Sequence, residues 1–252
     1  MILGIYREAT TAGKPEADIK IADAVAAELG RKGHRVVMTD KPQEESFDSY
    51  NAIFSMARSP GTLDLLESAE REGIVVVNSS RAIRACFNRE SVYRLMQENG
   101  IPVPATEKML LDRIPRRFPL MLKRADTHGK AGDTAEIKIE DDLARALQTF
   151  RERGVEEVLV QDYVGGRHVK FYGVGDKVYL PSYEGERADD MRTFACQTAR
   201  LVGLDVYGGD IMYDGRTAYV VDINDWPSFS SMREEAARAI AEHILISKFR
   251  TN

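Results

Sequence analysis

The stretch GGDIMYDGRTAYVVDIN, residues 208–224, decides the fold because it sets charged side chains inside two apolar runs. The runs, residues 208–213 and 217–223, flank the dipeptide Asp214-Gly215. Such a dipeptide between two β-prone segments is typical of a tight hairpin turn. The sequence therefore predicts an antiparallel β-hairpin here.

Three oxygen-bearing side chains of this hairpin are predicted to converge. Side chains alternate along a strand, so Asp222 and Asn224 share one face, and Val221 and Ile223 take the other. Asp210 lies on the partner strand. Carboxylate and amide oxygens together suit Mg²⁺, with Mn²⁺ as an alternative. The competing interpretation is a solvated hairpin, but Asp and Asn are depleted from ordinary strands.

The rest of the C-terminal part predicts more antiparallel strands and two helices. Strands are expected over residues 168–174 and 177–183, joined by Gly175-Asp176, and helices over 189–203 and 232–248.

The central part begins at Gly100-Ile-Pro-Val-Pro104, where two prolines exclude a helix. Beyond it the pattern predicts an α+β unit. Its expected strands are residues 120–124, 135–139 and 158–163, and its helix is 141–153.

The N-terminal part alternates strand and helix patterns, which favours a parallel three-layer α/β sheet. We expect strands at residues 2–7, 34–39, 52–56 and 73–77, helices at 16–31 and 63–71, and one long helix at 81–99.

Composition places the chain among ordinary globular proteins. It has 252 residues, a net charge of −5 and 43% hydrophobic residues. This acidity argues against a nucleic-acid partner, and no apolar run is long enough to cross a membrane. The start lacks a secretory signal, and two cysteines, Cys86 and Cys196, make no disulfide framework. We expect both in the core of a cytoplasmic protein.

Several common catalytic motifs are absent. The sequence contains no P-loop, no G-x-G-x-x-G after its first strand, no nucleophile elbow, no protein-kinase set and no helical pair of histidines. The chemistry must therefore come from a different arrangement.

Two strand lysines are candidates for binding an anion. Lys123 lies in the apolar run FPLMLKR, where a buried lysine needs a partner such as a nucleotide phosphate. The polar Gly-containing loop 126–134 follows and can offer backbone N–H groups to phosphates. Lys170 would bind phosphate or an anionic substrate if it faced the pocket. Each lysine has a simpler alternative as a solvent-facing edge-strand charge.

The run 158–164 offers a place for adenine. It is apolar except at Gln161 and Asp162, and a strand leaving one domain for another can present a backbone donor and acceptor between apolar walls. The alternative is a plain core strand with an exposed end.

The order of these motifs resembles the ATP-grasp superfamily over essentially the whole chain. The resemblance implies an N-terminal Rossmann-like α/β domain (1–80), a linker helix (81–102), a central α+β lid (103–164) and a C-terminal antiparallel-sheet domain (165–252). It also implies that ATP lies between the last two domains. The nucleotide-binding residues that it implies are Arg89, Lys123, His128, Gly129, Gln161, Asp162, Tyr163 and Val164. The implied Mg²⁺ ligands are Asp210, Asp222 and Asn224.

This resemblance implies an ADP-forming ligase that joins a carboxylate to an amine or thiol through an acylphosphate. Its partners would be ATP and a small-molecule acceptor, and Lys170 and Arg192 are the catalytic candidates, with Arg187 the weaker one. Asp222 stands where the family most often has glutamate, which is similar to the inositol-phosphate kinase branch. A small-molecule kinase and a degenerate nucleotide-binding module are the alternatives. The sequence indicates no oligomeric state.

Overall fold

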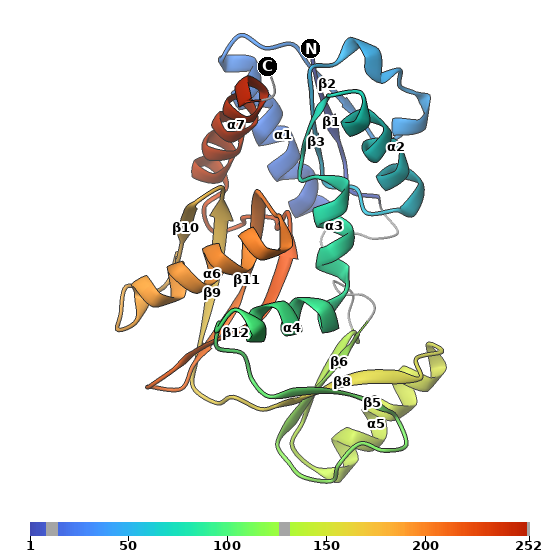
Figure 1. Cartoon of the computed structure of the whole chain (residues 1–252), viewed down its shortest axis with the longest axis vertical. Coiled ribbons are helices and arrows are strands. Elements are labelled where there is room, and N and C mark those ends of the chain that lie inside the picture. Colours follow the sequence, from blue (N-terminus) through green and yellow to red (C-terminus); the bar gives the residue numbers. More distant parts are fainter. Residues whose placement is uncertain (9–14, 126–131, 251–252) are drawn as a thin grey trace.

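Three four-stranded sheets follow one another along the chain in this computed structural model, which describes residues 1–8, 15–125 and 132–250 (Figure 1). The first sheet is parallel and the other two are antiparallel. The predicted mixed α/β and α+β fold class is confirmed.

The N-terminal sheet has the strand order β2-β1-β3-β4. Its central strands are fully buried because helices cover both faces, as the continuous apolar runs predicted. The strands are β1 (Ile2–Ile5), β2 (Val36–Thr39), β3 (Ala52–Ser55) and β4 (Val75–Val77). The helices are α1 (Pro15–Arg31) and α2 (Pro60–Arg71), with short 3₁₀ turns at Pro42–Glu44 and Phe47–Ser49.

The single long helix expected over residues 81–99 is wrong. Two helices, α3 (Ser80–Phe87) and α4 (Arg89–Glu98), meet at Asn88. The backbone of Asn88 is not helical, and its side chain accepts a 2.9 Å hydrogen bond from the backbone N–H of Ser91. Asn88 therefore ends one helix and caps the next.

The central sheet has the order β5-β8-β6-β7, and α5 (Glu140–Glu152) packs on one face. Its strands are β5 (Thr106–Leu110), β6 (Leu120–Arg124), β7 (Thr134–Ile137) and β8 (Glu157–Asp162). Strand β5 was not predicted, because it is an edge strand with no buried residue and so carries no hydrophobic alternation.

The C-terminal sheet has the order β10-β9-β11-β12. It consists of β9 (Arg167–Val174), β10 (Lys177–Tyr179), β11 (Val206–Tyr213) and β12 (Ala218–Asp225), with helices α6 (Ala188–Val202) and α7 (Arg233–Arg250). The strand predicted over 177–183 is too long. It stops before Pro181, and the backbone N–H of Tyr183 donates to the carbonyl of Leu180 in a turn.

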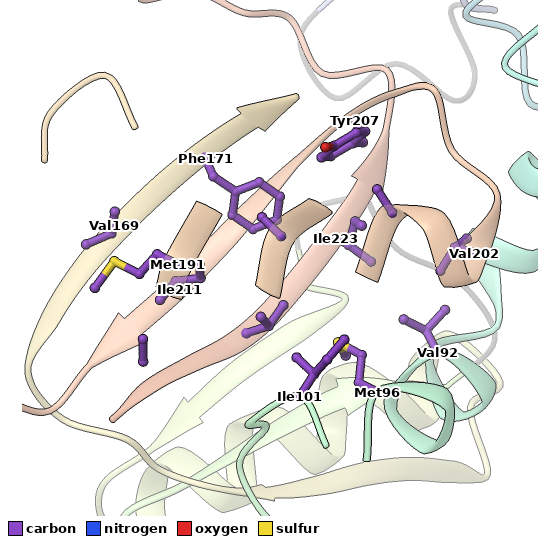
Figure 2. Packing of buried hydrophobic residues seen from close by; sticks show 14 of the residues in the cluster. Val92, Met96, Ile101, Val169, Phe171, Met191, Val202, Tyr207, Ile211 and Ile223 are labelled. Atoms are coloured by element: carbon purple, nitrogen blue, oxygen red, sulfur yellow. The ribbon is translucent and has the colours of Figure 1, made fainter. Parts of the chain in front are cut away.

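Two cores hold the C-terminal sheet in place. One lies between the sheet and α4 and α6, and it includes Met96, Met191 and Ile223 (Figure 2). The other joins β9 and α7 to the N-terminal sheet and α1, so the first and last parts of the chain share a core (Figure 1). Among the described residues, no helix is long and apolar enough to cross a membrane.

The two cysteines differ in burial, which corrects the expectation that both lie in the core. Cys86 on α3 is buried, whereas Cys196 on α6 is half-buried. Burial raises the pKa of the Cys86 thiol, so this thiol is protonated and shielded at neutral pH.

We expect a thiol reagent to modify one cysteine in the native protein and both in the unfolded protein. Titration with Ellman's reagent, with and without guanidinium chloride, measures this difference. Rapid modification of Cys86 in the native protein, located by peptide mapping, would contradict the packing of α3 against β12.

Candidate functional site

The register of the C-terminal sheet brings two carboxylates together. Asp210 on β11 lies directly opposite Asp222 on β12, and Lys170 on β9 lies opposite Asp210 on the other side. Gly209 allows this close packing, since a Cβ there would lie 2.1 Å from the carbonyl oxygen of Asp222. Like charges facing each other across a ladder are unfavourable, which marks the pair as a functional candidate.

Two cationic or titratable side chains surround the Asp210 carboxylate. Its Oδ1 atom lies 2.7 Å from His168 Nε2 and 3.1 Å from Lys170 Nζ. The strand lysine Lys170 thus points toward the predicted cluster, although half of its side chain remains exposed.

Asp222 is tied to Asn224 and to the linker. The Asn224 amide donates to Asp222 Oδ2 over 2.9 Å, as expected for side chains on one face of a strand. Arg89, buried at the start of α4, lies 3.7 Å from Asp222 Oδ1 and donates to the carbonyl of Arg124 on β6. Arg89 therefore reaches both the central and the C-terminal sheets.

The oxygen donors present are suited to Mg²⁺. Asp210, Asp222 and Asn224 offer carboxylate and amide oxygens, and no cluster of three or more His, Cys, Asp or Glu side chains occurs in residues 1–8, 15–125 and 132–250. A site with only two carboxylates leaves coordination positions for water and nucleotide phosphates. These residues fit a metal shared with ATP better than a metal enclosed by protein.

A β-bulge separates the acidic end of β12 from the rest of the strand. Ile211 pairs with Val220 and Asp210 pairs with Asp222, so Val221 is the extra residue. Val220 and Ile223 both reach the core, which corrects the prediction that Val221 shares a face with Ile223. The carbonyl of Val221 accepts a 2.7 Å hydrogen bond from Lys123 Nζ.

Lys123 is buried, which rules out the solvent-facing alternative. It lies on the central strand β6, is 5% exposed, and also donates to the Tyr93 hydroxyl over 2.9 Å. Tyr93 in turn donates to the Val221 carbonyl. Lys123 and Arg89 thus set two buried cations beside residues 221–222 of β12.

We expect Lys123→Met to weaken the binding of an ATP analogue by about 1.5–3 kcal/mol, the range for hydrogen bonds to charged groups. Isothermal titration calorimetry measures this change. Lys108→Met is the matched control, because Lys108 shares a cross-strand row with Lys123 but pairs with Glu90 and Glu157 at the surface. Equal affinities for both variants would remove Lys123 from the nucleotide site.

The residues predicted to read adenine lie at the end of β8. Gln161 is buried and donates to the Thr106 hydroxyl over 2.9 Å, while Asp162 pairs with Arg117 at the surface. Only the backbone of this segment and the partly exposed Tyr163 remain suited to a base, followed by Val164. The other two predicted nucleotide contacts, His128 and Gly129, lie outside the described residues.

The contacts of Arg192 do not place it beside Asp210 and Asp222. It pairs with Glu184 at 2.9 Å and with Asp189 at 3.0 Å, both exposed. Arg187 pairs with Asp190 in the same region. Lys170 thus lies beside the carboxylate cluster, whereas Arg192 would have to leave two ion pairs to reach it.

Sequence reasoning missed Tyr93 and Asp225. Tyr93 lies one turn into α4, and its sequence pattern is that of an ordinary core residue. Nothing in that pattern indicates that its hydroxyl accepts a hydrogen bond from Lys123. Strand alternation only places Asp225 on the face opposite Asp222 and gives no partner for it. It is 1% exposed and ion-paired with Arg58, whose Nη2 lies 2.7 Å from Asp225 Oδ1.

Comparisons with known proteins agree on one fold. No protein-family model matches the chain. A probable alpha-L-glutamate ligase 2 of Hahella chejuensis is 24% identical over 217 residues, 72% of this chain and 70% of the relative. A probable alpha-L-glutamate ligase of Stutzerimonas stutzeri is 21% identical over 264 residues, 85% of this chain and 86% of the relative.

Solved structures extend the likeness over nearly the whole chain. A D-alanine–D-alanine ligase from Bacillus anthracis, complexed with ATP, superposes with a TM-score of 0.76 at 14% identity, covering 99% of this chain and 97% of that one. A RimK domain ATP-grasp protein from Sphaerobacter thermophilus gives 0.75 at 19% identity, covering 97% and 100%. The chain therefore shares its overall fold with these solved structures, one of which is named an ATP-grasp protein.

Proposed function

We propose that the protein is an Mg-ATP-dependent ligase that joins a carboxylate to an amine through an acylphosphate. The observation that carries this proposal is the meeting of three parts of the chain at residues 221–222 of β12. Lys123 comes from the central sheet, Arg89 from the linker, and Asp210 from the neighbouring strand. Two buried cations beside two acids suit the phosphates of a nucleotide and the cation that accompanies them.

In the reaction, the γ-phosphoryl group of ATP moves to a carboxylate oxygen, and ADP leaves. The amine then attacks the acyl carbon and loses a proton, an amide bond forms as the bond from that carbon to the bridging oxygen breaks, and inorganic phosphate departs with this oxygen of the former carboxylate. Mg²⁺ supplies charge neutralisation during the first transfer. The protein needs no nucleophile of its own, which agrees with the burial of Cys86.

The individual side chains have separate tasks in this scheme. Asp210, Asp222 and Asn224 would hold the cation, and Lys123 and Arg89 would bind phosphate oxygens. Lys170, which pairs with Asp210 at 3.1 Å, lies at the edge of the carboxylate cluster, where its charge would stabilise the transferred phosphoryl group. The backbone of residues 161–164 receives adenine.

The names of the relatives support amino acids as substrates. Glutamate and D-alanine, which occur in those names, both carry a carboxylate and an amine. We therefore propose an amino acid or a peptide as the acceptor. Free thiols at both cysteines support a reducing compartment, and we propose the cytoplasm.

A small-molecule kinase is the second candidate. His168 and Lys170 beside Asp210 would suit an anionic acceptor with a hydroxyl group, and the kinase would use the same nucleotide residues.

The deciding experiment follows the phosphate of Mg-ATP in the presence of amino acids, short peptides and polyol phosphates. Release of ADP and free phosphate with an amide product supports the ligase. Retention of phosphate on a polyol acceptor supports the kinase, and AMP as the product would overturn both.

A further inference from the structure

The chain changes direction immediately after the candidate metal ligand Asn224. Asp225 ends β12, and Trp226 and Phe229 follow with positive φ angles of 39° and 47°. Residues other than glycine rarely adopt this left-handed backbone conformation, because it costs them conformational free energy. Such a conformation persists only where its surroundings hold it in place.

The N-terminal sheet supplies contacts that hold this segment. Arg58 follows β3, and its guanidinium grips the Asp225 carboxylate at two points, with Nε 3.1 Å from Oδ2 and Nη2 2.7 Å from Oδ1. The same Nη2 donates to the Asp225 backbone carbonyl over 3.0 Å. One arginine thus fixes both the side chain and the backbone of Asp225.

A second arginine holds the next residue. Arg7 follows β1, which neighbours β3, and donates to the Trp226 carbonyl over 2.8 Å. Its Nε lies 2.9 Å from Asp18 Oδ2 on α1. The indole of Trp226 is fully buried and stacks on Phe54 of β3, with ring centroids 5.9 Å apart.

Both arginines carry charge at neutral pH. Burial would lower the pKa of Arg58, but the Asp225 carboxylate outweighs it and raises that pKa. Burial and the neighbouring Arg58 lower the pKa of Arg7 to about 10, which still leaves it protonated. The segment is therefore held by charge-assisted hydrogen bonds, the strongest kind available to it.

We propose that Arg58 and Arg7 are positioning residues of the nucleotide site, which fix the end of β12 and hence the placement of Asn224 and Asp222 at the cation. This inference rests on the proposed function, since it presumes that the carboxylates bind a metal. It makes the N-terminal domain a structural determinant of metal binding, although neither arginine contacts the cluster of Asp210, Asp222 and Asn224 in the contacts described above.

The test is Mn²⁺ binding in the presence of a non-hydrolysable ATP analogue, followed by electron paramagnetic resonance at a temperature where circular dichroism shows each variant folded. Arg58→Lys keeps the positive charge, but a lysine cannot reproduce the two guanidinium contacts with the Asp225 carboxylate. We expect this variant to weaken Mn²⁺ binding about tenfold, the lower end of the loss caused by removing a group that orients a metal ligand, because Arg58 acts through the neighbouring Asp225. Binding of the analogue without metal should change by less than about twofold.

Arg84→Lys is the matched control, because Arg84 pairs with the exposed Asp64 on a neighbouring helix. It should leave Mn²⁺ affinity unchanged. Should Arg58→Lys fail to fold, Arg7→Lys replaces it, since a lysine cannot serve both the Trp226 carbonyl and Asp18. A merely structural role would lower the melting temperature without altering the Mn²⁺ affinity of the folded protein.

Two outcomes separate this inference from the proposed function. Wild-type Mn²⁺ affinity in a folded Arg58→Lys or Arg7→Lys variant would overturn the positioning role alone. Wild-type protein that binds Mn²⁺ no better than Asp222→Asn would overturn the metal site, and the positioning role with it.

Discussion

Asp222→Asn is expected to reduce Mg-ATP turnover by about 100-fold or more while leaving the protein folded. Loss of an outer-shell partner of a metal ligand already costs about 10–100-fold, and here a ligand itself loses its charge. The free energy of unfolding of the ligand-free variant should stay close to that of the wild type, because relief of the repulsion between Asp222 and Asp210 offsets the loss of the 3.7 Å charge contact with Arg89. Steady-state ADP release and urea unfolding measure the two effects.

Asp176→Asn is the control for this change. Asp176 lies in the turn between β9 and β10, is largely exposed and pairs with Arg200. Its loss should leave turnover close to that of the wild type. Similar, mild losses at both positions would mean that β11 and β12 bind no catalytic metal.

Asp225→Asn should lower the stability of the folded protein, which Asp222→Asn leaves intact. Removing its charge leaves the buried Arg58 without its carboxylate partner and Arg7 with Asp18 as its nearest one, and breaking a buried ion pair in this way costs roughly 3–5 kcal/mol. We expect the free energy of unfolding to fall by about 3 kcal/mol, since asparagine retains part of the hydrogen bonding. Urea denaturation monitored by circular dichroism measures it.

Asp222→Asn is the matched comparison, since both substitutions are isosteric and lie on the same strand. Only the side chain of Asp225 lies among arginines of the N-terminal sheet. If the two variants were equally stable, the ion pairs of Asp225 would contribute nothing to the folded state.

The chemistry-bearing hairpin could be predicted because its signal is local. Asp222 and Asn224 are two residues apart, and strand alternation alone places them together. Arg58 and Asp225 are 167 residues apart. Nothing in the local pattern around Arg58 distinguishes it from a surface arginine, so its buried pairing required the tertiary structure.

Errors in the predicted elements have similarly local causes. A helix pattern continues through Asn88 because the apolar spacing on both sides is compatible, and only the side-chain cap on Ser91 breaks it. Strand β5 is defined by backbone pairing with β8 rather than by buried side chains. The bulge at Val221 interrupts an alternation that the sequence shows as regular.

Trp226 also gives the protein a built-in optical reporter. It is the sole tryptophan of the chain, is fully buried, and lies two residues beyond Asn224. Selective excitation of its indole therefore reads the junction between the first and third sheets, with no contribution from the central sheet. A red shift of its emission would signal the parting of that junction even where the total helix content stays constant, which separates local opening from global unfolding in one cuvette.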